Sequence, residues 1–583
     1  MVRSRRLARL GAYILPHWRD ATWGIVTLFI VNGLGVYIPQ LVRACVDQLS
    51  KGFSLNQVFQ YVVPIFLLTS AMWLIRMASR IWLFGVGRQV EFDLKQRIFE
   101  HLLTLEPSYF DSNTTGDLIS RATSDVDNIR RLLGFAVLSL ANTVFAYALT
   151  LPFMLSINVE LTLTAVVIYP FMFLIVHLFS DRLRNQQAAV QEKISDVSEL
   201  IQEDISGIAL IKIYAQEENE RRAFAQKNRQ LLGANLTLAK TRNTLFPLIG
   251  GLASVSSLII IWLGTERIAA GSLSVGDFVA LLIYVERLVF PTTLLGFTIT
   301  AYQRGEVSID RIDAIFAAKP KIKTESEAID LEMSQVKGEL AAKNLSYTYQ
   351  GAKKAALQDL NFTISPGETV AIVGAIGSGK STLANALPRL LNIQPGQLFL
   401  DGVDITQIKL DDLRNAIAYV PQDSFLFSTT IQNNIRYGDP LAEYEQVESA
   451  AKTAQIHAEI QNFPQKYTTI VGERGITLSG GQRQRTALAR AMIVDASVLI
   501  LDDALSSVDN QTATAILNNL SGGVHRKTVV FITHQLSAAA AADRIFVMDQ
   551  GKIIQIGTHI ELVQQQGLYR SLWSQHQVEE LLH

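Results

Sequence analysis

The segment GAIGSGKS at residues 374–381 has the spacing G-x-x-x-x-G-K-S. In such a loop the small residues let backbone N–H groups close around phosphates, the lysine reaches the terminal phosphates, and the serine hydroxyl is offered to Mg²⁺. Farther along the chain come the pentapeptide LSGGQ at 478–482 and the apolar run VLILDD at 498–503, which ends in two aspartates. The loop by itself predicts a nucleotide phosphate site, and the two later segments narrow the class of enzyme.

These three segments, in this order, resemble the ATPase domain of ABC proteins. In that family LSGGQ covers the ATP bound to the partner subunit, so a single copy implies that two nucleotide domains meet. The resemblance implies ATP and Mg²⁺ as cofactors, with Ser381, Gln422 and Asp502 at the metal. It also implies a set of nucleotide-binding residues, namely Tyr349, Gly374, Ala375, Ile376, Gly377, Ser378, Gly379, Lys380, Ser381, Thr382, Ser479, Gly480, Gly481 and Gln482.

The composition indicates a membrane part joined to a soluble part. Of the 583 residues 49% are hydrophobic and the mean hydropathy is +0.22, which is high for a soluble chain of this length. Stretches long enough to cross a bilayer, at about 20 residues each, occur only before residue 300, at 21–42, 58–84, 133–155, 160–180, 243–264 and 277–299. The net charge of −1 argues against nucleic acid as a partner, because a nucleic-acid-binding domain is clearly basic. Cys45 is the single cysteine, so no internal disulfide forms, and no Cys or His spacing indicates a metal site.

The distribution of basic residues predicts the orientation in the membrane. Lys and Arg are concentrated before the first apolar stretch and in the segments 85–132 and 181–242, whereas the opposite loops hold only Arg43, Lys51 and Arg267. By the positive-inside rule the N-terminus and both long segments are cytoplasmic. A cleavable signal is not expected, since the first apolar stretch has spanning length and no small-residue cleavage site. We therefore expect a multi-pass protein of the cell (inner) membrane with its nucleotide domain in the cytoplasm.

Six spans followed by one nucleotide domain resemble the half-transporters of the type IV ABC exporters, a group of multidrug and lipid exporters. The resemblance implies an all-α six-helix transmembrane domain at 1–317, a linker at 318–337 and an α/β P-loop ABC ATPase domain at 338–583.

The two long cytoplasmic segments have a helical pattern that turn residues interrupt at Pro107 and at 113–116. The resemblance implies a short coupling helix in each segment, at 115–121 and at 211–218, which rests on a nucleotide domain. The alternative is a pair of solvated helical hairpins whose charges serve solubility.

The same resemblance gives roles to four isolated positions. It implies that Tyr349 stacks on adenine, that Gln422 contacts Mg²⁺ and the attacking water, that Glu473 senses the coupling helices, and that His534 holds the γ-phosphate. Each of them, taken alone, has an ordinary structural alternative, such as a strand residue or a solvated turn. The catalytic set predicted from the sequence is Asp503, His534 and Gln422.

Asp503 departs from the family pattern, in which a glutamate follows the Mg²⁺-binding aspartate and polarises the hydrolytic water. An aspartate carboxylate stands one methylene farther back, and general-base assistance typically contributes about 10² to 10⁴ in rate. Heterodimeric exporters often pair a chain that lacks this glutamate but keeps LSGGQ with a partner that has the glutamate. This chain has that combination, which predicts a slow site of its own. The alternative is an aspartate that still works through a small backbone shift or an extra water.

The predicted function is ATP-driven export of an amphipathic drug-like compound, lipid or peptide by half of a dimeric transporter. A heterodimer with a second half-transporter is favoured and a homodimer is possible. The alternatives are a non-hydrolysing regulatory ATP-binding subunit, or a homodimeric lipid flippase in which Asp503 is the working base. Ionisable residues inside the spans are costly in lipid, so they either face a central cavity or lie beyond the lipid; they are Arg76, Arg80, His177, Glu286 and Arg287.

Overall fold

In the computed structural model, which describes residues 10–49, 55–325, 327–508, 510–521 and 526–582, the chain forms two compact units. The first unit holds the chain up to Leu103 together with Asn113–Ala318, and the second holds Thr104–Ser112 together with the chain from Lys319 onward. Several residues of the charge argument lie outside the described residues, namely Arg3, Arg5, Arg6, Arg9 and Lys51.

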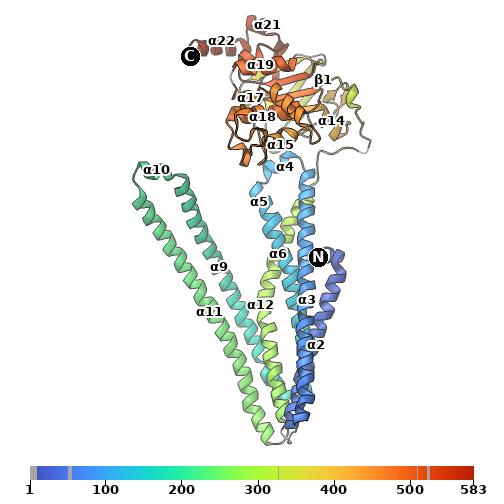
Figure 1. Ribbon diagram of the computed structural model, residues 1–583, viewed down its shortest axis with the longest axis vertical. Coiled ribbons are helices and arrows are strands. Elements are labelled where there is room, and N and C mark those ends of the chain that lie inside the picture. Colours follow the sequence, from blue (N-terminus) through green and yellow to red (C-terminus); the bar gives the residue numbers. More distant parts are fainter. Residues whose placement is uncertain (1–9, 50–54, 326, 509, 522–525, 583) are drawn as a thin grey trace. The chain divides into compact units, whose positions relative to one another are not determined.

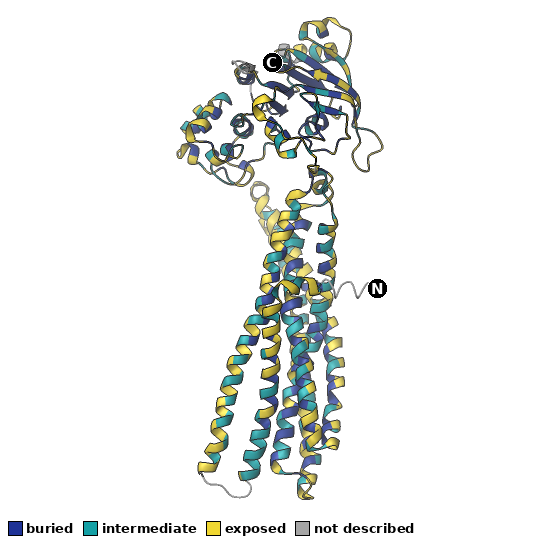
Figure 2. Ribbon diagram, turned by 90° about the vertical axis from the view of Figure 1, so that its right-hand side faces the viewer, coloured by how far each residue is buried: buried dark blue, intermediate teal, exposed yellow. Residues whose placement is uncertain are grey.

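The described residues of the first unit include six long helices, and each of these helices contains one of the predicted spans (Figure 1). By length and composition they can cross a membrane, and they run over Leu10–Leu49, Asn56–Thr104, Thr115–Ile157, Val159–Ser206, Glu217–Ala269 and Val275–Ala317. Large apolar side chains on them remain exposed, such as Phe66 at 68% and Trp262 at 74%. Figure 2 shows exposed residues along much of the length of these helices. Apolar surface of this extent indicates faces that meet lipid or another protein.

The long helices are partly composite. The third begins with α5 (Thr115–Ser120) and is interrupted by two π-helical turns, and a turn at Val167 divides the fourth. The bounds of the elements in this unit are α2 Trp18–Leu49, α3 Leu55–Thr104, α6 Val126–Arg131, α7 Val137–Ile157, α8 Val159–Val166, α9 Ile168–Ser206, α10 Ile208–Ile213, α11 Glu217–Ala269 and α12 Val275–Ala317, with the π-helical turns at Arg121–Asp125 and Leu132–Ala136.

The last helix, α12, is the central element of the first unit. It packs against α2, α7, α9 and α11. Two buried tyrosines bind it to its neighbours: the Tyr284 hydroxyl donates to the Val36 carbonyl at 2.7 Å, and the Tyr169 hydroxyl donates to the Val285 carbonyl at 2.7 Å. Helices α9 and α11 lie side by side and are joined by α10 (Figure 1).

Short separate helices occur in both long segments, but at other residues than predicted. In the first segment the separate helix is α4, Pro107–Ser112, whereas residues 115–120 form the first turn of the third long helix. The predicted breaks at Pro107 and at 113–116 are both present, because Pro107 starts α4 and the Thr114 side chain caps α5 by accepting from the Asp117 N–H. In the second segment the short helix is α10, and Glu217 already begins α11.

The predicted linker at 318–337 is packed onto the second unit from Lys319 onward. The backbone N–H of Lys321 donates to the Glu106 carboxylate at 3.1 Å, and Ile329 forms an isolated parallel bridge with Ile408. Glu106 lies in the segment Thr104–Ser112, which the sequence had placed in the first domain and which the structure groups with the second unit. These backbone contacts are long-range, so composition alone did not reveal them.

The second unit is built on two sheets. A four-stranded sheet has the order β2-β1-β4-β5 with antiparallel neighbours, and a six-stranded sheet has the order β10-β9-β3-β8-β7-β6, in which only the pair β10 and β9 is antiparallel. The strands are β1 Leu340–Tyr347, β2 Leu357–Ile364, β3 Thr369–Gly374, β4 Leu398–Leu400, β5 Val403–Asp404, β6 Ile417–Val420, β7 Val498–Asp502, β8 Thr528–Ile532, β9 Arg544–Asp549 and β10 Lys552–Gly557.

Helices cover the parallel sheet, whose central strands are fully buried (Figure 2). Continuous apolar strands of this kind are typical of a parallel sheet with both faces covered. The helices of the second unit after α4 are α13 Lys380–Ala386, α14 Leu410–Ala416, α15 Ile431–Arg436, α16 Tyr444–Thr453, α17 His457–Asn462, α18 Gly480–Met492, α19 Asn510–Ser521, α20 Leu536–Ala539, α21 His559–Gln564 and α22 Leu568–Leu582. The carboxyl ends of parallel strands meet at one edge of a sheet, which is where ligands bind in such folds. Here β3, β8, β7 and β6 all end at that edge.

Candidate functional site

The phosphate loop leaves β3 at Gly374 and enters α13 at Lys380. Its shape depends on glycines at both ends, because Gly374 and Gly379 have φ values of +153° and +101°. A Cβ on Gly374 would lie 2.1 Å from the Met548 carbonyl oxygen, and one on Gly379 would lie 2.5 Å from that of Ala356. The loop therefore packs directly on neighbouring backbone, and these contacts fix its shape.

Polar groups gather inside this loop. The Lys380 ammonium donates to the carbonyl oxygens of Gly374 and Ala375, each at 2.9 Å, and the side chain is buried. Burial lowers the pKa of Lys380, while the charges of Asp502 and Asp503 oppose that shift. The Ser378 hydroxyl is buried and has no hydrogen-bond partner among the described residues. A buried cation and an unpaired hydroxyl fit a bound anion such as a nucleotide phosphate.

A metal corner lies beside the loop. The Ser381 hydroxyl donates to the Asp502 carboxylate at 3.0 Å, where β7 ends. A hydroxyl and a carboxylate are hard oxygen ligands, which Mg²⁺ prefers together with water and substrate phosphates. No group of three His, Cys, Asp or Glu residues that could hold a metal occurs in the described part of the chain. Bound Mg²⁺ would neutralise charge on the β- and γ-phosphates.

Asp502 should make Mg²⁺ binding sensitive to pH. Burial raises the pKa of this carboxyl, against hydrogen bonds from Ser381 and Tyr419 that lower it. Magnesium binds the ionised carboxylate, so its affinity falls as the pH drops, and a raised pKa moves that fall to a higher pH than an ordinary aspartate would show. We expect the Mg²⁺ dissociation constant, measured with bound ATP, to rise several-fold between pH 7.5 and pH 5.5. ATP also takes up protons in this range, so the comparison is with Asp502→Asn, which should bind Mg²⁺ weakly at both pH values.

Asp503 follows the metal aspartate at the same strand edge. It has a positive φ of +49°, and its backbone N–H donates to the Ile532 carbonyl at 3.0 Å, which connects the ends of β7 and β8. One carboxylate oxygen, Oδ1, is buried and has no hydrogen-bond partner among the described residues. Burial raises the pKa of Asp503, and the charges of His534 and Lys380 oppose this shift. The Asp503 side chain is therefore half-buried, and charges of the site act on it.

The remaining predicted catalytic residues also follow strand ends. Gln422 comes two residues after β6 and His534 two residues after β8, and both are exposed. Thr533, between β8 and His534, is buried, so only the tip of this segment reaches the surface. The strand order β3-β8-β7-β6 places all these residues along one edge with the phosphate loop. Their specific roles stay predictions.

Tyr349 lies close to the phosphate loop. Its hydroxyl is 3.2 Å from the Thr382 hydroxyl, and its ring meets Tyr347 edge to face at 5.1 Å. The residue is 38% exposed. A ring that is held on one side and open on the other can accept an adenine by stacking.

The signature segment caps a helix. Ser479 accepts from the Gln482 N–H while the Gln482 side chain accepts from the Ser479 N–H, which is a capping box at the start of α18. Glu459 holds the same turn, accepting from the Gln482 amide at 2.8 Å and pairing with Arg485 at 2.7 Å. Among the described residues, the segment 479–482 makes no hydrogen bond to the phosphate loop of its own chain.

The signature helix is connected to the backbone that follows Asp503. The Gln484 amide donates to the Ser506 hydroxyl at 3.0 Å and accepts from the Ser507 N–H at 2.9 Å. These hydrogen bonds join the helix that carries the signature segment to the segment that follows Asp503.

The sequence reasoning missed two residues beside the metal corner, Tyr419 and Asn385. The Tyr419 hydroxyl donates to the Asn385 side chain at 3.0 Å and lies 3.4 Å from the Asp502 carboxylate. Tyr419 is on β6, next to β7 in register with Ile500. Only the pairing of these two strands could have placed it beside the metal corner.

Glu473 and the charged residues of the spans lie outside the group of residues at the strand edge. Glu473 is exposed and begins a short turn in which Arg474 has a φ of +53°. Arg287 is held by α2, because its guanidinium donates to the Asn32 carbonyl at 3.0 Å. The large cavity of the first unit is lined by a different set of residues, and Arg76, Arg80, His177, Glu286 and Arg287 are not among them.

Comparison with known families gives two matches. Residues 22–292 match the ABC transporter transmembrane region, and residues 357–506 match the ABC transporter family.

Similar proteins cover nearly the whole chain. It is 33% identical to the probable multidrug resistance ABC transporter ATP-binding/permease protein YheI of Bacillus subtilis, over 98% of each chain. It is 32% identical to the multidrug resistance-like ATP-binding protein MdlA of Escherichia coli, over 99% of this chain and 98% of that one. The identity to the ATP-dependent lipid A-core flippase of Thiobacillus denitrificans is 32%, over 98% of each. The structure of a bacterial Atm1-family ABC exporter with ATP bound superposes with a TM-score of 0.79 at 25% identity, covering 96% of this chain and 99% of that one.

Proposed function

The chain belongs to the ABC transporter family, with the domains of an exporter half-transporter, and on this premise we propose that it pairs with a different half-transporter and contributes a slow ATP site. As a member it is an ATPase-coupled multi-pass membrane transporter that uses ATP to drive export. The cargo that we propose is an amphipathic compound, because the relatives include multidrug exporters and a lipid flippase.

The observation that carries the proposal is the position of Asp503. Its Oδ1 is buried and has no hydrogen-bond partner among the described residues, and an aspartate side chain is one methylene shorter than the glutamate of the family pattern, so its carboxylate reaches less far toward a water that would attack a γ-phosphate. A base must reach within hydrogen-bond distance of the water it activates. The metal corner beside it, Ser381 with Asp502, has the donors that Mg²⁺ needs, so ATP binding is retained while hydrolysis is slow.

The signature segment has the complementary property. Its capping box is complete and Ser479 at its start is exposed, so this turn is available to the nucleotide of a partner. The chain would therefore support fast hydrolysis at the partner's site.

The proposed location of the protein is the inner membrane of a bacterial cell. In the proposed orientation, the N-terminus and the nucleotide domain are in the cytoplasm. The charge distribution supports this, since α9, α10 and the first part of α11 carry most of the basic residues of their hairpin. Helix α10 exposes Leu210 at 61% and Ile213 at 72%, and such an apolar surface suits contact with a nucleotide domain. We assign the coupling role to α10 and α4.

A second candidate is a homodimer in which Asp503 is the working base at both sites. It is supported by the raised pKa of Asp503, because a base is most effective when its pKa lies near the working pH. The two candidates predict opposite effects of the same substitutions.

The test measures single-turnover ATP hydrolysis and transport for Asp503→Glu and Asp503→Asn. We expect Asp503→Glu to speed hydrolysis at this chain's own site at least about tenfold, a fraction of what a general base typically contributes. Asp503→Asn should alter transport by less than about twofold when the partner's site is intact, since that site then carries the general-base chemistry. Near-complete loss of transport in the asparagine variant of such a complex would favour the homodimer-type base and reject the slow site.

A further inference from the structure

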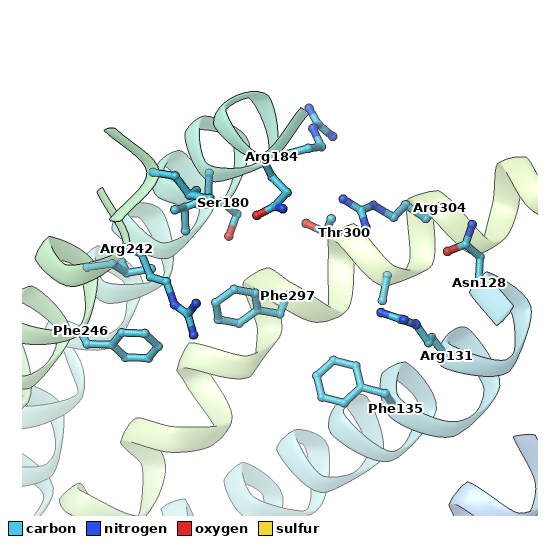
Figure 3. A pocket seen from close by; sticks show the side chains of 15 residues that line it. Asn128, Arg131, Phe135, Ser180, Arg184, Arg242, Phe246, Phe297, Thr300 and Arg304 are labelled. Atoms are coloured by element: carbon cyan, nitrogen blue, oxygen red, sulfur yellow. The ribbon is translucent and has the colours of Figure 1, made fainter. Parts of the chain in front are cut away.

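A cavity of about 610 Å³ opens within the first unit between four of its long helices. Its walls come from the third helix around α6, and from α9, α11 and α12 (Figure 3). Every residue of this wall belongs to the first unit. The cavity is thus a property of this chain, at the level where its apolar spans end.

Each of the four helices contributes one arginine to the cavity, namely Arg131, Arg184, Arg242 and Arg304. None of the described lining residues is acidic. Arg131 pairs with Asp127 at 2.7 Å and Arg184 with Asp181 at 3.2 Å, both on their own helices. Arg242 and Arg304 make no hydrogen bond or ion pair with any described residue. Two full positive charges therefore face this space uncompensated.

Aromatic rings form a second layer at a defined depth. Phe135 follows Arg131 by one helical turn, and Phe246 follows Arg242 by one turn, toward the apolar spans 133–155 and 243–264. Helix α12 runs in the opposite direction, and there Phe297 precedes Arg304 by about two turns. Figure 3 shows Arg242 next to Phe246 and Phe297, and Arg131 next to Phe135. The arginines stand at the outer end of the spans and the rings stand deeper.

We propose that this cavity selects an amphipathic anion, with a phosphate or carboxylate head held by Arg242 and Arg304 and an apolar body among the three phenylalanines. The proposal rests on the proposed export function and names the class of its substrate. Guanidinium groups bind phosphate and carboxylate through paired N–H donors, and such charge-assisted hydrogen bonds are strong. A cation with the same apolar body would meet like charges and no carboxylate.

A non-specific explanation for arginines at span ends is the positive-inside rule, by which such arginines only contact water or lipid head groups. That rule fixes the depth of a basic residue but not the side of the helix on which it stands. Here one arginine from each of four helices lines the same cavity, together with aromatic rings. Arg182 is a contrast on α9, since it is also exposed and stands two residues from Arg184 but does not line the cavity.

The experiment uses the full chain in nanodiscs of zwitterionic phosphatidylcholine, with the proposed partner where one is identified. Binding is measured for dodecyl phosphate, for dodecyltrimethylammonium, which has the same tail, and for inorganic phosphate. We expect dodecyl phosphate to bind at least about tenfold more tightly than either of the others, because it alone supplies both head and tail. Arg242→Gln and Arg304→Gln should each weaken its binding about tenfold, while Arg304→Lys keeps part of it and Arg182→Gln stays within about twofold.

Two arms separate the sources of such an anion. Competition by phosphatidylglycerol in the nanodisc indicates a lipid head group as the natural occupant, and binding that the lipid does not compete for indicates a soluble amphiphile. Equal binding of the anionic and cationic probes, or binding unchanged in both glutamine variants, would overturn the proposal.

ATP binding and thermal unfolding are followed in every variant, so that misfolding is recognised. If the transporter hydrolyses ATP and exports a cationic compound, the proposed selection of an anion is refuted and the export function is retained. A complex of this chain with its partner that cannot drive any transport with ATP would instead refute the export function.

Discussion

Lys380→Ala is expected to abolish ATP binding at this chain's own site. The ammonium group is the one buried cation of the phosphate loop, and at present it bonds two carbonyl oxygens of that loop. Its charge-assisted hydrogen bonds to phosphate are worth about 1.5 to 3 kcal/mol each, so two of them correspond to a loss of ~100-fold or more in affinity. Titration of the purified chain with a fluorescent ATP analogue measures the effect directly.

Matched variants separate charge from packing. Lys380→Met keeps most of the buried stem and should lose ATP as fully as the alanine variant, whereas Lys409→Ala removes an exposed lysine that pairs with Asp330 and should leave binding unchanged. The fold should survive, because β3 and the glycine turns hold the loop. If nucleotide binding were the same in Lys380→Ala as in the wild type, the glycine loop would not be the site.

Much of this site could be predicted from sequence, because the phosphate loop, the pair Asp502–Asp503 and His534 all lie at the ends of buried strands. VLILDD has five residues in β7, and the run that ends before His534 forms β8, so the apolar pattern placed the acidic and basic side chains at strand ends. The parallel arrangement then brought these ends together at one edge. The six spans were equally accessible, since hydropathy over about 20 residues reports the length of a membrane helix directly.

Features set by which side of an element faces its neighbour could not be predicted. Hydropathy located the ends of the spans but not the side on which Arg242 and Arg304 stand, so the sequence could name only the charges inside the spans as candidates for a cavity lining and left their position open. Arg287 illustrates the difference, because its guanidinium packs on α2 so closely that a Cβ on Gly35 would lie 1.6 Å from it. Helix α4 was likewise missed, since it belongs to the second unit together with Glu106, which accepts from the distant Lys321 N–H.

Gly480→Glu is expected to stop ATP hydrolysis at the partner's site. Gly480 is the first residue of α18, a helix of 13 residues whose N–H groups and dipole attract an anion. A glutamate there would place a negative charge and a bulky side chain against the γ-phosphate of the facing nucleotide. Since this chain's own site is proposed to be slow, turnover of the whole complex should fall at least about 100-fold, within the range that an electrostatic contact to the transition state typically contributes.

The neighbouring glycine and a small substitution supply the controls. A Cβ on Gly480 would lie 3.6 Å from the Ser507 hydroxyl, an ordinary contact, so Gly480→Ala should fold and bind ATP normally, and any loss of turnover it shows arises at the partner. On Gly481 a Cβ would lie 2.7 Å from the Ser507 carbonyl oxygen, so Gly481→Ala must displace the segment after Asp503 and disturb this chain's own site as well. Steady-state ATPase activity of the assembled complex, with ATP binding to each chain measured separately, distinguishes an effect at the partner's site from an effect at this chain's own site. Undiminished turnover with Gly480→Glu would mean that this signature segment does not act on the partner's nucleotide, and the dimeric site would have to be completed by other residues.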